Sequence, residues 1–151
     1  LLVRLDRQIQ QLIRELGWWQ HYRRCRSIPG IGPANAAALV AAYHRGAFAG
    51  SDAFVAFLGL DIRLRQSGRF KGKSKLTKQG EPELRRLLYC ASKGAQTHPR
   101  FAAYHQRMLD QGLPKIAARV ALARKLARIA FALISRQEYF ENRNPTACGE
   151  P

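Results

Sequence analysis

A basic stretch in the middle of the sequence contains no acid and limits what this chain can fold into. Between Ile62 and Lys78 there are seven positive side chains: Arg63, Arg65, Arg69, Lys71, Lys73, Lys75 and Lys78. The stretch cannot neutralise its own charge and therefore favours a polyanion as its partner. Apolar and basic residues alternate at its start and glycines follow, which predicts a partly extended loop or small hairpin with a turn at Ser67-Gly68.

Composition indicates one basic domain with a core of its own. The chain has 151 residues, of which 46% are hydrophobic, so it lies well away from disordered compositions. It carries 26 Lys and Arg against 10 Asp and Glu, a formal net charge of +16. A charge this large opposes compaction by self-repulsion. We interpret it as the sign of an anionic partner, with nucleic acid favoured over an anionic membrane face.

Cysteine spacing and hydropathy argue against a metal centre and a membrane span. Cys25, Cys90 and Cys148 lack CxxC spacing and form no metal-binding pattern with the histidines. We therefore expect free thiols in a reducing cytoplasm and no cofactor held by this chain. No apolar run approaches the roughly 18 to 20 residues that cross a bilayer, so we expect a cytoplasmic protein without a membrane partner. The chain begins with Leu1 rather than Met, and we expect it to be a piece of a longer protein.

An apolar repeat at the N-terminus predicts a helix that needs a partner. Its apolar residues fall at alternating spacings of three and four: Leu2, Leu5, Ile9, Leu12 and Leu16. This is the a/d pattern of a coiled-coil seam, and two heptads are marginally stable alone. Three arrangements remain open: the helix packs on its own domain, mediates self-association, or continues a longer helix.

The segment SIPGIGP at residues 27–33 predicts a helix-hairpin-helix element over residues 27–44. A helix is expected before the hairpin and an alanine-rich helix after it. Gly30 and Gly32 permit a tight turn and leave backbone N–H groups at a helix N-terminus free to bind a phosphate oxygen. The alternative is a Pro-Gly turn that only joins two packed helices.

Capping and periodicity predict helices along the rest of the chain. Ser51-Asp52 is expected to cap a short helix whose Phe54, Phe57 and Leu58 face inward. Further helices are expected to begin near Pro82, His98-Pro99 and Pro114. In the last one, the expected buried residues are Ile116, Val120, Ala127, Ile129, Leu133 and Ile134, with basic residues on the remaining surface.

The predicted fold is mainly α. It consists of an N-terminal heptad-like helix and the entry to the hairpin (1–26), one domain (27–141) and a flexible tail (142–151). Within the domain, the basic loop occupies residues 59–80 and helices fill residues 82–140.

Several motifs occur in a fixed order and together resemble a known family. SIPGIGPANAAALVAA is followed by GL, then by SG, then by KQG and LRRLL. From about Ser27 to Tyr139, this order resembles the C-terminal domain of DEDD-type insertion-sequence transposases, which pair a RuvC-like N-terminal domain with this C-terminal domain.

The resemblance implies a split active site. In that family the serine of the SG motif is implicated as a nucleophile on the DNA backbone, and here it corresponds to Ser67. The RuvC-like domain is expected to supply four carboxylates and Mg²⁺, so this chain alone is not expected to be active. The implied partners are DNA and an element-encoded guide RNA.

Two functions therefore remain open from the sequence. In the first, Ser67 is the catalytic residue of a DNA-recombining transposase; in the second, the chain is a non-catalytic helix-hairpin-helix module that binds DNA or RNA. In both, the expected nucleic-acid contacts are Gly30, Gly32, Arg63, Arg65, Arg69, Lys71, Lys73, Lys75, Lys78 and Arg85. We also expect self-association through the N-terminal helix.

Overall fold

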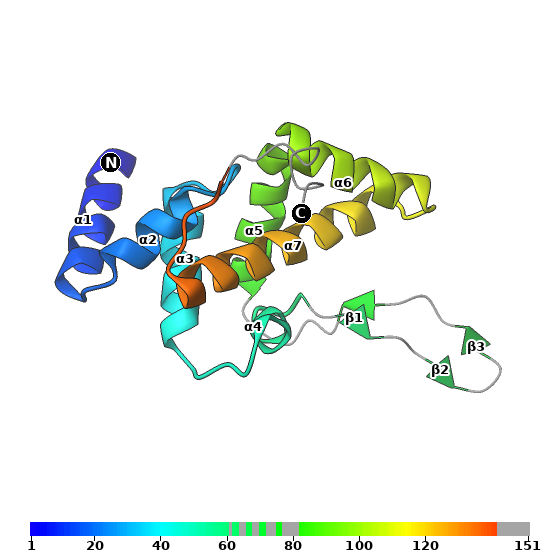
Figure 1. Ribbon diagram of the computed structural model, residues 1–151, viewed down its shortest axis with the longest axis horizontal. Coiled ribbons are helices and arrows are strands. Elements are labelled where there is room, and N and C mark those ends of the chain that lie inside the picture. The colour runs from blue at the N-terminus through cyan, green and yellow to red at the C-terminus, as the bar shows by residue number, and fades with distance from the viewer. Residues whose placement is uncertain (61, 64–65, 68–69, 72–74, 77–81, 142–151) are drawn as a thin grey trace, which may run out of the picture.

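The computed structural model describes residues 1–60, 62–63, 66–67, 70–71, 75–76 and 82–141, with side chains for 1–60 and 82–141. It is mainly helical (Figure 1), which confirms the predicted fold class. The described helices are α1 (Leu2–Glu15), α2 (Trp19–Arg26), α3 (Pro33–His44), α4 (Ser51–Phe57), α5 (Pro82–Ala95), α6 (Pro99–Asp110) and α7 (Lys115–Arg136). The strands are β1 (Ile62–Arg63), β2 (Gln66–Ser67), β3 (Phe70–Lys71) and β4 (Lys75–Leu76).

Helix α7 is the centre of the core and contacts α2, α3, α4, α5 and α6. Alanines and leucines dominate its buried face, which consists of Ala118, Leu122, Ala123, Leu126, Ala127, Ala130, Leu133 and Ile134. Alanine allows neighbouring helix backbones to approach closely, so several helices can pack on one. The expected burial of Ala127, Leu133 and Ile134 is confirmed. Ile116 is 68% exposed instead, because it lies in the first turn, ahead of the first buried residue of α7.

The short helix α4 packs on α7 but begins differently from the prediction. Its N-cap is Gly50, without a side-chain cap hydrogen bond, so Ser51 already belongs to the first turn. Asp52 pairs instead with Arg128 of α7, with 2.9 Å between Oδ1 and Nη2. Phe54 and Leu58 are fully buried as expected, whereas Phe57 is 36% exposed.

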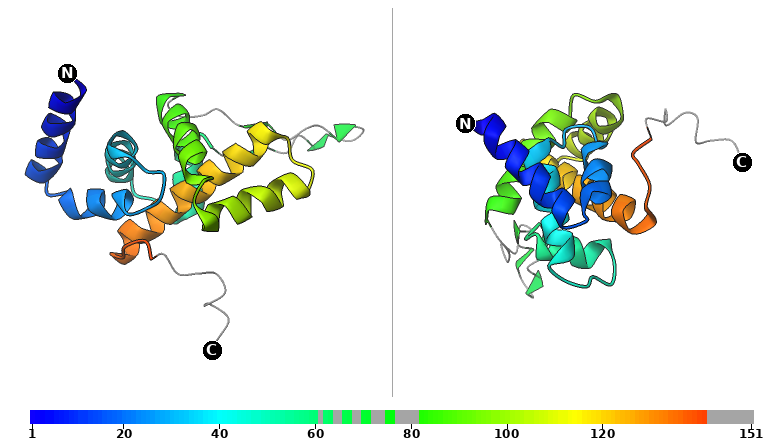
Figure 2. Two further views of the ribbon diagram at one scale, coloured as in Figure 1. Left: turned by 90° about the horizontal axis from the view of Figure 1, so that it is seen from above. Right: turned by 90° about the vertical axis from the view of Figure 1, so that its left-hand side faces the viewer.

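Helix α1 lies at the margin of the molecule and covers little of it. Figure 2 shows it as the blue helix at one end, where it contacts α2 and α3. Ile13 is its one buried residue. The apolar residues Leu2, Leu5, Ile9, Leu12 and Leu16 are all exposed, by 78%, 47%, 40%, 55% and 48%. The predicted helix is therefore present, and the predicted seam is exposed in the part of the chain that the structure describes.

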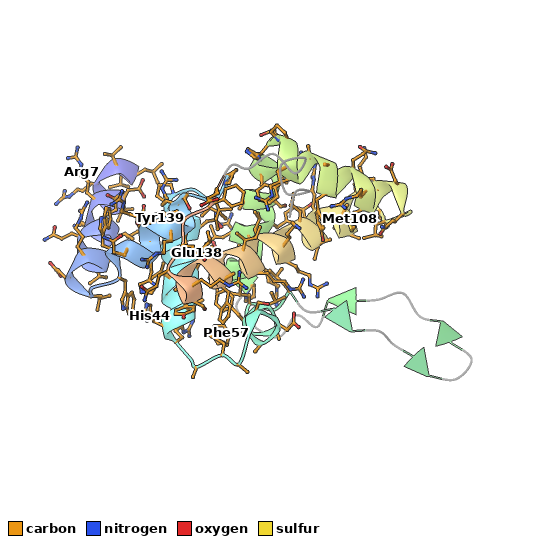
Figure 3. All side chains as sticks on the ribbon, viewed as in Figure 1. Arg7, His44, Phe57, Met108, Glu138 and Tyr139 are labelled. Carbon is orange, nitrogen blue, oxygen red and sulfur yellow. The ribbon has the colours of Figure 1, made fainter. Side chains whose placement is uncertain are left out.

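The segment after α7 turns back along α2. Gln137 adopts a left-handed conformation and ends the helix. The Tyr139 hydroxyl then donates a hydrogen bond to Gln20 Oε1 at 2.8 Å, and Figure 3 shows Tyr139 beside α2. The Phe140 N–H donates to Ser27 Oγ at 2.9 Å, while the Phe140 ring lies 5.7 Å from Phe101. The predicted tail at 142–151 lies outside the described residues.

The strands form a narrow antiparallel arrangement that projects from the helices (Figures 1 and 2). Ile62 pairs with Leu76 and Arg63 with Lys75, while Gln66 pairs with Lys71 and Ser67 with Phe70. The two antiparallel pairs form two separate two-stranded sheets, β1 with β4 and β2 with β3. The part of the chain that the structure describes contains no helix long and apolar enough to cross a bilayer.

Candidate nucleic-acid interface

The turn between α2 and α3 is anchored in the core by its two isoleucines. Ile28 and Ile31 are 2% and 3% exposed, and the Ile31 N–H donates to the Ile28 carbonyl at 3.1 Å. The Arg26 side chain donates to the Ile31 carbonyl at 2.9 Å. The glycine-rich turn therefore has a defined position between two packed helices, α2 and α3.

Gly30 lies where this turn touches the C-terminal end of α5. Its φ is +88°, in the left-handed region that favours glycine. A Cβ added at Gly30 would lie 2.6 Å from the Ala95 nitrogen and 2.8 Å from its Cα. This close approach gives Gly30 a structural reason to be glycine that is separate from any phosphate contact.

Gly32 has a different environment two residues later. It is the N-cap of α3 in an extended conformation, and a Cβ added there would meet nothing within 4 Å. Pro33 occupies the first turn, and no side chain caps the helix. Helix N-termini without a side-chain cap leave N–H donors for other acceptors, so this end of the turn suits an anion better than Gly30 does.

The hairpin brings part of the basic stretch together. Ser67 is the last residue of β2, and two residues separate it from its partner Phe70 on β3. Arg63 on β1 and Lys75 on β4 are directly opposite in register, and Lys71 follows Phe70 on β3. Arg65, Arg69, Lys73 and Lys78 are predicted contacts that lie outside the described residues.

Arg85 lies on the first turns of α5 and is half-buried. Its Nη1 atom is buried and has no hydrogen-bond partner among the described residues. The neighbouring Arg86 pairs with Glu83 through Nε at 3.0 Å, and this contact lowers the pKa of the Glu83 carboxyl. Arg85 therefore retains hydrogen-bonding capacity that Arg86 has already used.

A second basic cluster lies on α6 and α7 and could be predicted only in part from the sequence. It consists of Arg100, Arg107, Lys125 and Arg128. Lys125 Nζ lies 4.4 Å from the centre of the Tyr104 ring, and Arg107 lies over the same ring at 5.8 Å. Burial, followed by the charges of Arg100, Arg107 and Arg128, lowers the pKa of Lys125. The basic face of α7 was visible as a helical pattern, but the contribution of Arg100 and Arg107 from α6 depends on helix packing.

The titratable residues of the helical body do not form a metal centre. Within residues 1–60 and 82–141, no three His, Cys, Asp or Glu side chains are grouped to hold an ion. Cys25 is buried, which raises the pKa of its thiol to about 12. Such a thiol stays protonated at neutral pH and is a poor nucleophile.

A mainly helical, strongly basic domain with a projecting basic hairpin has the features of a protein that handles nucleic acid. The pattern of the transposase IS116/IS110/IS902 family matches residues 22–106, more than half of the chain. This chain belongs to that transposase family.

Three curated relatives match almost the whole chain. It is 35% identical over 146 residues to the "Probable family 20 transposase" of Pseudomonas aeruginosa, covering 90% of this chain and 41% of that protein. It is 30% identical over 147 residues to the "Pilin gene-inverting protein" of Moraxella bovis, covering 94% of this chain and 46% of that protein. The protein of the same name from Moraxella lacunata is 30% identical over 151 residues, with 94% and 46% covered. The chain thus spans less than half the length of these relatives.

Proposed function

We propose that this chain is the DNA-binding and serine-bearing part of an insertion-sequence transposase that cuts and rejoins DNA strands. The observation that carries the proposal is the position of Ser67 at the end of β2, paired with Phe70 of β3, in a transposase-family chain. The surrounding stretch from Ile62 to Lys78 has seven cations and no acid. A phosphodiester drawn to these cations would lie close to the Ser67 backbone.

The chemistry assigned to Ser67 is a pair of transesterifications. Its Oγ attacks the phosphorus of a DNA phosphodiester, a phosphoserine ester forms, and the displaced DNA hydroxyl takes up a proton. Attack by a DNA hydroxyl on that ester then forms a new phosphodiester and restores the serine, so no co-reactant is consumed. A serine hydroxyl is a weak nucleophile, and positive charge from residues such as Arg63 and Lys71 favours its alkoxide and the charged transition state.

The metal-dependent part of the reaction is assigned to a RuvC-like domain elsewhere in the full protein. The described side chains of this chain do not group three or more candidate ligands. More than half of each relative lies outside the matched part, which leaves room for such a domain. A bound Mg²⁺ would stabilise charge on the phosphate oxygens. We therefore expect this chain alone to bind DNA without cutting it.

Two further partners belong to the same proposal. The positive surface suits an element-encoded guide RNA as well as DNA, because phosphate contacts are shared by both polymers. The exposed seam of α1 suits a second copy of the chain, since Leu5, Ile9 and Leu12 keep a/d spacing and are exposed among the described residues.

The direct test is to follow recombination by the full-length protein with DNA and Mg²⁺. Ser67→Ala should abolish recombination and leave DNA affinity and thermal stability within error, because one hydroxyl contributes little to either. Ser74→Ala, in the same basic stretch, is the matched control and should retain activity. Denatured reaction mixtures should contain a protein–DNA adduct that mass spectrometry maps to Ser67. Full recombination by Ser67→Ala would remove the nucleophile from the proposal.

A second candidate is a non-catalytic helix-hairpin-helix module. The open, uncapped start of α3 at Gly32 favours it, because that geometry binds phosphate without chemistry. The module predicts that Ser67→Ala is silent in every assay. It also predicts salt-sensitive binding to any duplex, with a slope of log K against log salt of about −4 to −5 for some five phosphate contacts.

A further inference from the structure

A hollow on the outer face of α7 has the lining of an anion site. Its volume is about 470 Å³, and it lies where the start of α4 meets the second half of α7. The residues that line it are Ser51, Lys125, Arg128, Ile129, Phe131, Ala132, Ser135 and Arg136. They comprise three cations and two hydroxyls, and no carboxylate. We call this feature the α7 hollow.

Positive charge is crowded at one end of the α7 hollow. Lys125 is half-buried beside Tyr104, and Arg100 and Arg107 of α6 are close enough to disfavour its charged form. Arg128 adds a third nearby positive charge. Like charges held together by packing repel one another, so a bound anion would relieve a cost that the fold already contains.

Two acids of α4 and α6 are already paired. Asp52 accepts two hydrogen bonds from Arg128, at 3.2 Å from Nε and 2.9 Å from Nη2. Asp110 of α6 accepts one from Gln106 at 2.9 Å. Arg128 is therefore partly neutralised and held in place, whereas Lys125 has its pKa lowered by burial and by the positive charges around it.

The other end of the hollow offers hydroxyls and an apolar wall. Ser135 lies 3.4 Å from the Tyr43 hydroxyl, and Ser51 opens α4. Phe131 is half-buried and belongs to an aromatic cluster with Phe54, at 5.5 Å between ring centroids. Hydroxyl and guanidinium donors suit the non-bridging oxygens of a phosphate, and an apolar wall suits the sugar beside it.

We propose that the α7 hollow binds the phosphodiester backbone of nucleic acid, as a second contact surface built from different elements than the serine-bearing hairpin. The proposal rests on the proposed function only in taking nucleic acid as the ligand. Lys125 and Arg136 supply the main positive charge, and Arg128 is a positioning residue tied to Asp52. Both DNA and RNA carry this group, so the test compares the two.

The test measures binding of the 151-residue chain to a labelled 20-base-pair DNA and to a 20-nucleotide RNA across a salt series. Lys125→Gln with Arg136→Gln should make the negative slope of log K against log salt shallower, if each cation neutralises one phosphate. The expected change is about 2 for duplex DNA and about 1.4 for single-stranded RNA. A loss with only one polymer identifies which of them occupies the hollow. Arg4→Gln with Arg7→Gln on α1 is the matched control, because it removes the same charge from an exposed helix. Figure 3 shows Arg7 at the outer side of α1.

Further variants separate binding from folding and from chemistry. Lys125→Arg with Arg136→Lys keeps the charge and should restore most of the slope. Thermal melting of the glutamine pair should change little, since relief of repulsion among the cations offsets the lost contact of Lys125 with the Tyr104 ring. Ser67→Ala should leave the salt slope unchanged. The recombination assay therefore tests the serine proposal, and the salt slope tests the α7 hollow independently.

Three results would overturn the proposal. One is an equal slope of log K against log salt for the Lys125→Gln/Arg136→Gln variant and for the Arg4→Gln/Arg7→Gln control. Another is a loss of binding that follows a fall in melting temperature. The third is weakened binding to vesicles containing phosphatidylserine with unchanged binding to both nucleic acids.

Discussion

The first and last helices both carry apolar stripes, yet only one stripe is buried. In α7, Leu122 and Leu126 have no exposed surface, whereas in α1 Leu5 and Leu12 are 47% and 55% exposed. The difference lies in what surrounds each helix: among the described elements, α7 packs against α2, α3, α4, α5 and α6, whereas the main neighbours of α1 are α2 and α3. Helical periodicity therefore predicts which face is apolar, and it does not predict what covers that face.

The turn that joins the N-terminal helices to the core is where we expect the largest effect. Gly30→Val should cost about 4 kcal/mol of stability, from a left-handed backbone and from overlap with the Ala95 backbone. Gly32→Ala should cost less than about 1 kcal/mol, because its Cβ meets open space and only the N-cap preference is lost. Urea denaturation measures both. Equal losses would contradict the close contact between the turn and α5.

Truncating one leucine in each helix tests the comparison directly. Leu126→Ala should destabilise the chain by about 3 kcal/mol, since it leaves a cavity in the core. Leu12→Ala should change the stability of the monomer by less than about 0.5 kcal/mol, as expected for an exposed position. Both values come from urea denaturation at low protein concentration. A cost above about 2 kcal/mol for Leu12→Ala would show that α1 packs more closely than described.

The exposed stripe of α1 should matter for association instead. Leu5→Glu with Leu12→Glu should raise the dimer dissociation constant by more than about tenfold, roughly 1.4 kcal/mol, because two charges enter the seam. Ile116→Glu is the control, since Ile116 is 68% exposed on α7 and outside that seam. Sedimentation equilibrium measures the constant. A parent chain that stays monomeric at all concentrations would contradict the assignment of α1 to a second copy.

The smallest effect concerns two histidines that attach α2 to the end of α3. The His44 ring stacks on Trp18 at 4.3 Å, and His21 meets His44 edge-on at 5.2 Å. Burial lowers the pKa of both imidazoles, and the charges of His44 and Arg24 lower that of His21 further. The folded chain then binds protons less readily than the unfolded chain, whose histidines titrate near 6.5. The two neutral histidines therefore contribute fully to the free energy of unfolding above that pH, and this contribution is lost as the pH falls below it.

Hydrogen exchange locates this effect. Protection of α2 and α3 should fall between pH 7 and pH 5 after correction for intrinsic exchange, while α7, which contains no histidine, should change less. His44→Phe keeps an aromatic ring over Trp18 and should reduce the pH dependence. An equal fall in all helices would indicate global acid unfolding rather than a local loosening at the histidine pair.

Much of the fold could be predicted because its signals are local. Pro33, Pro82 and Pro99 each occupy the first turn of a helix, as their missing N–H and fixed φ favour. The basic stretch between Ile62 and Lys78 could also be identified from its charges alone. The start of α4 was predicted less well, because Gly50 rather than a polar side chain precedes it and Asp52 is held by distant Arg128.

Part of the candidate site could not be predicted in this way. The role of Gly30 depends on Ala95, which is 65 positions away in the sequence and makes contact only once α5 has packed. Arg100 and Arg107 look like ordinary exposed helix residues until α6 lies beside α7 and brings them near Lys125. Such contacts join residues that no spacing rule connects.

The sequence by itself determined most of the helices, the excess of positive charge and the place of Ser67 within a basic stretch, because each follows from neighbours a few residues apart. The tertiary structure decided which apolar stripe is buried, why Gly30 must be glycine and where cations from separate helices meet. These outcomes depend on long-range packing, whose energy is set by the shapes of surfaces that come together only in the folded chain.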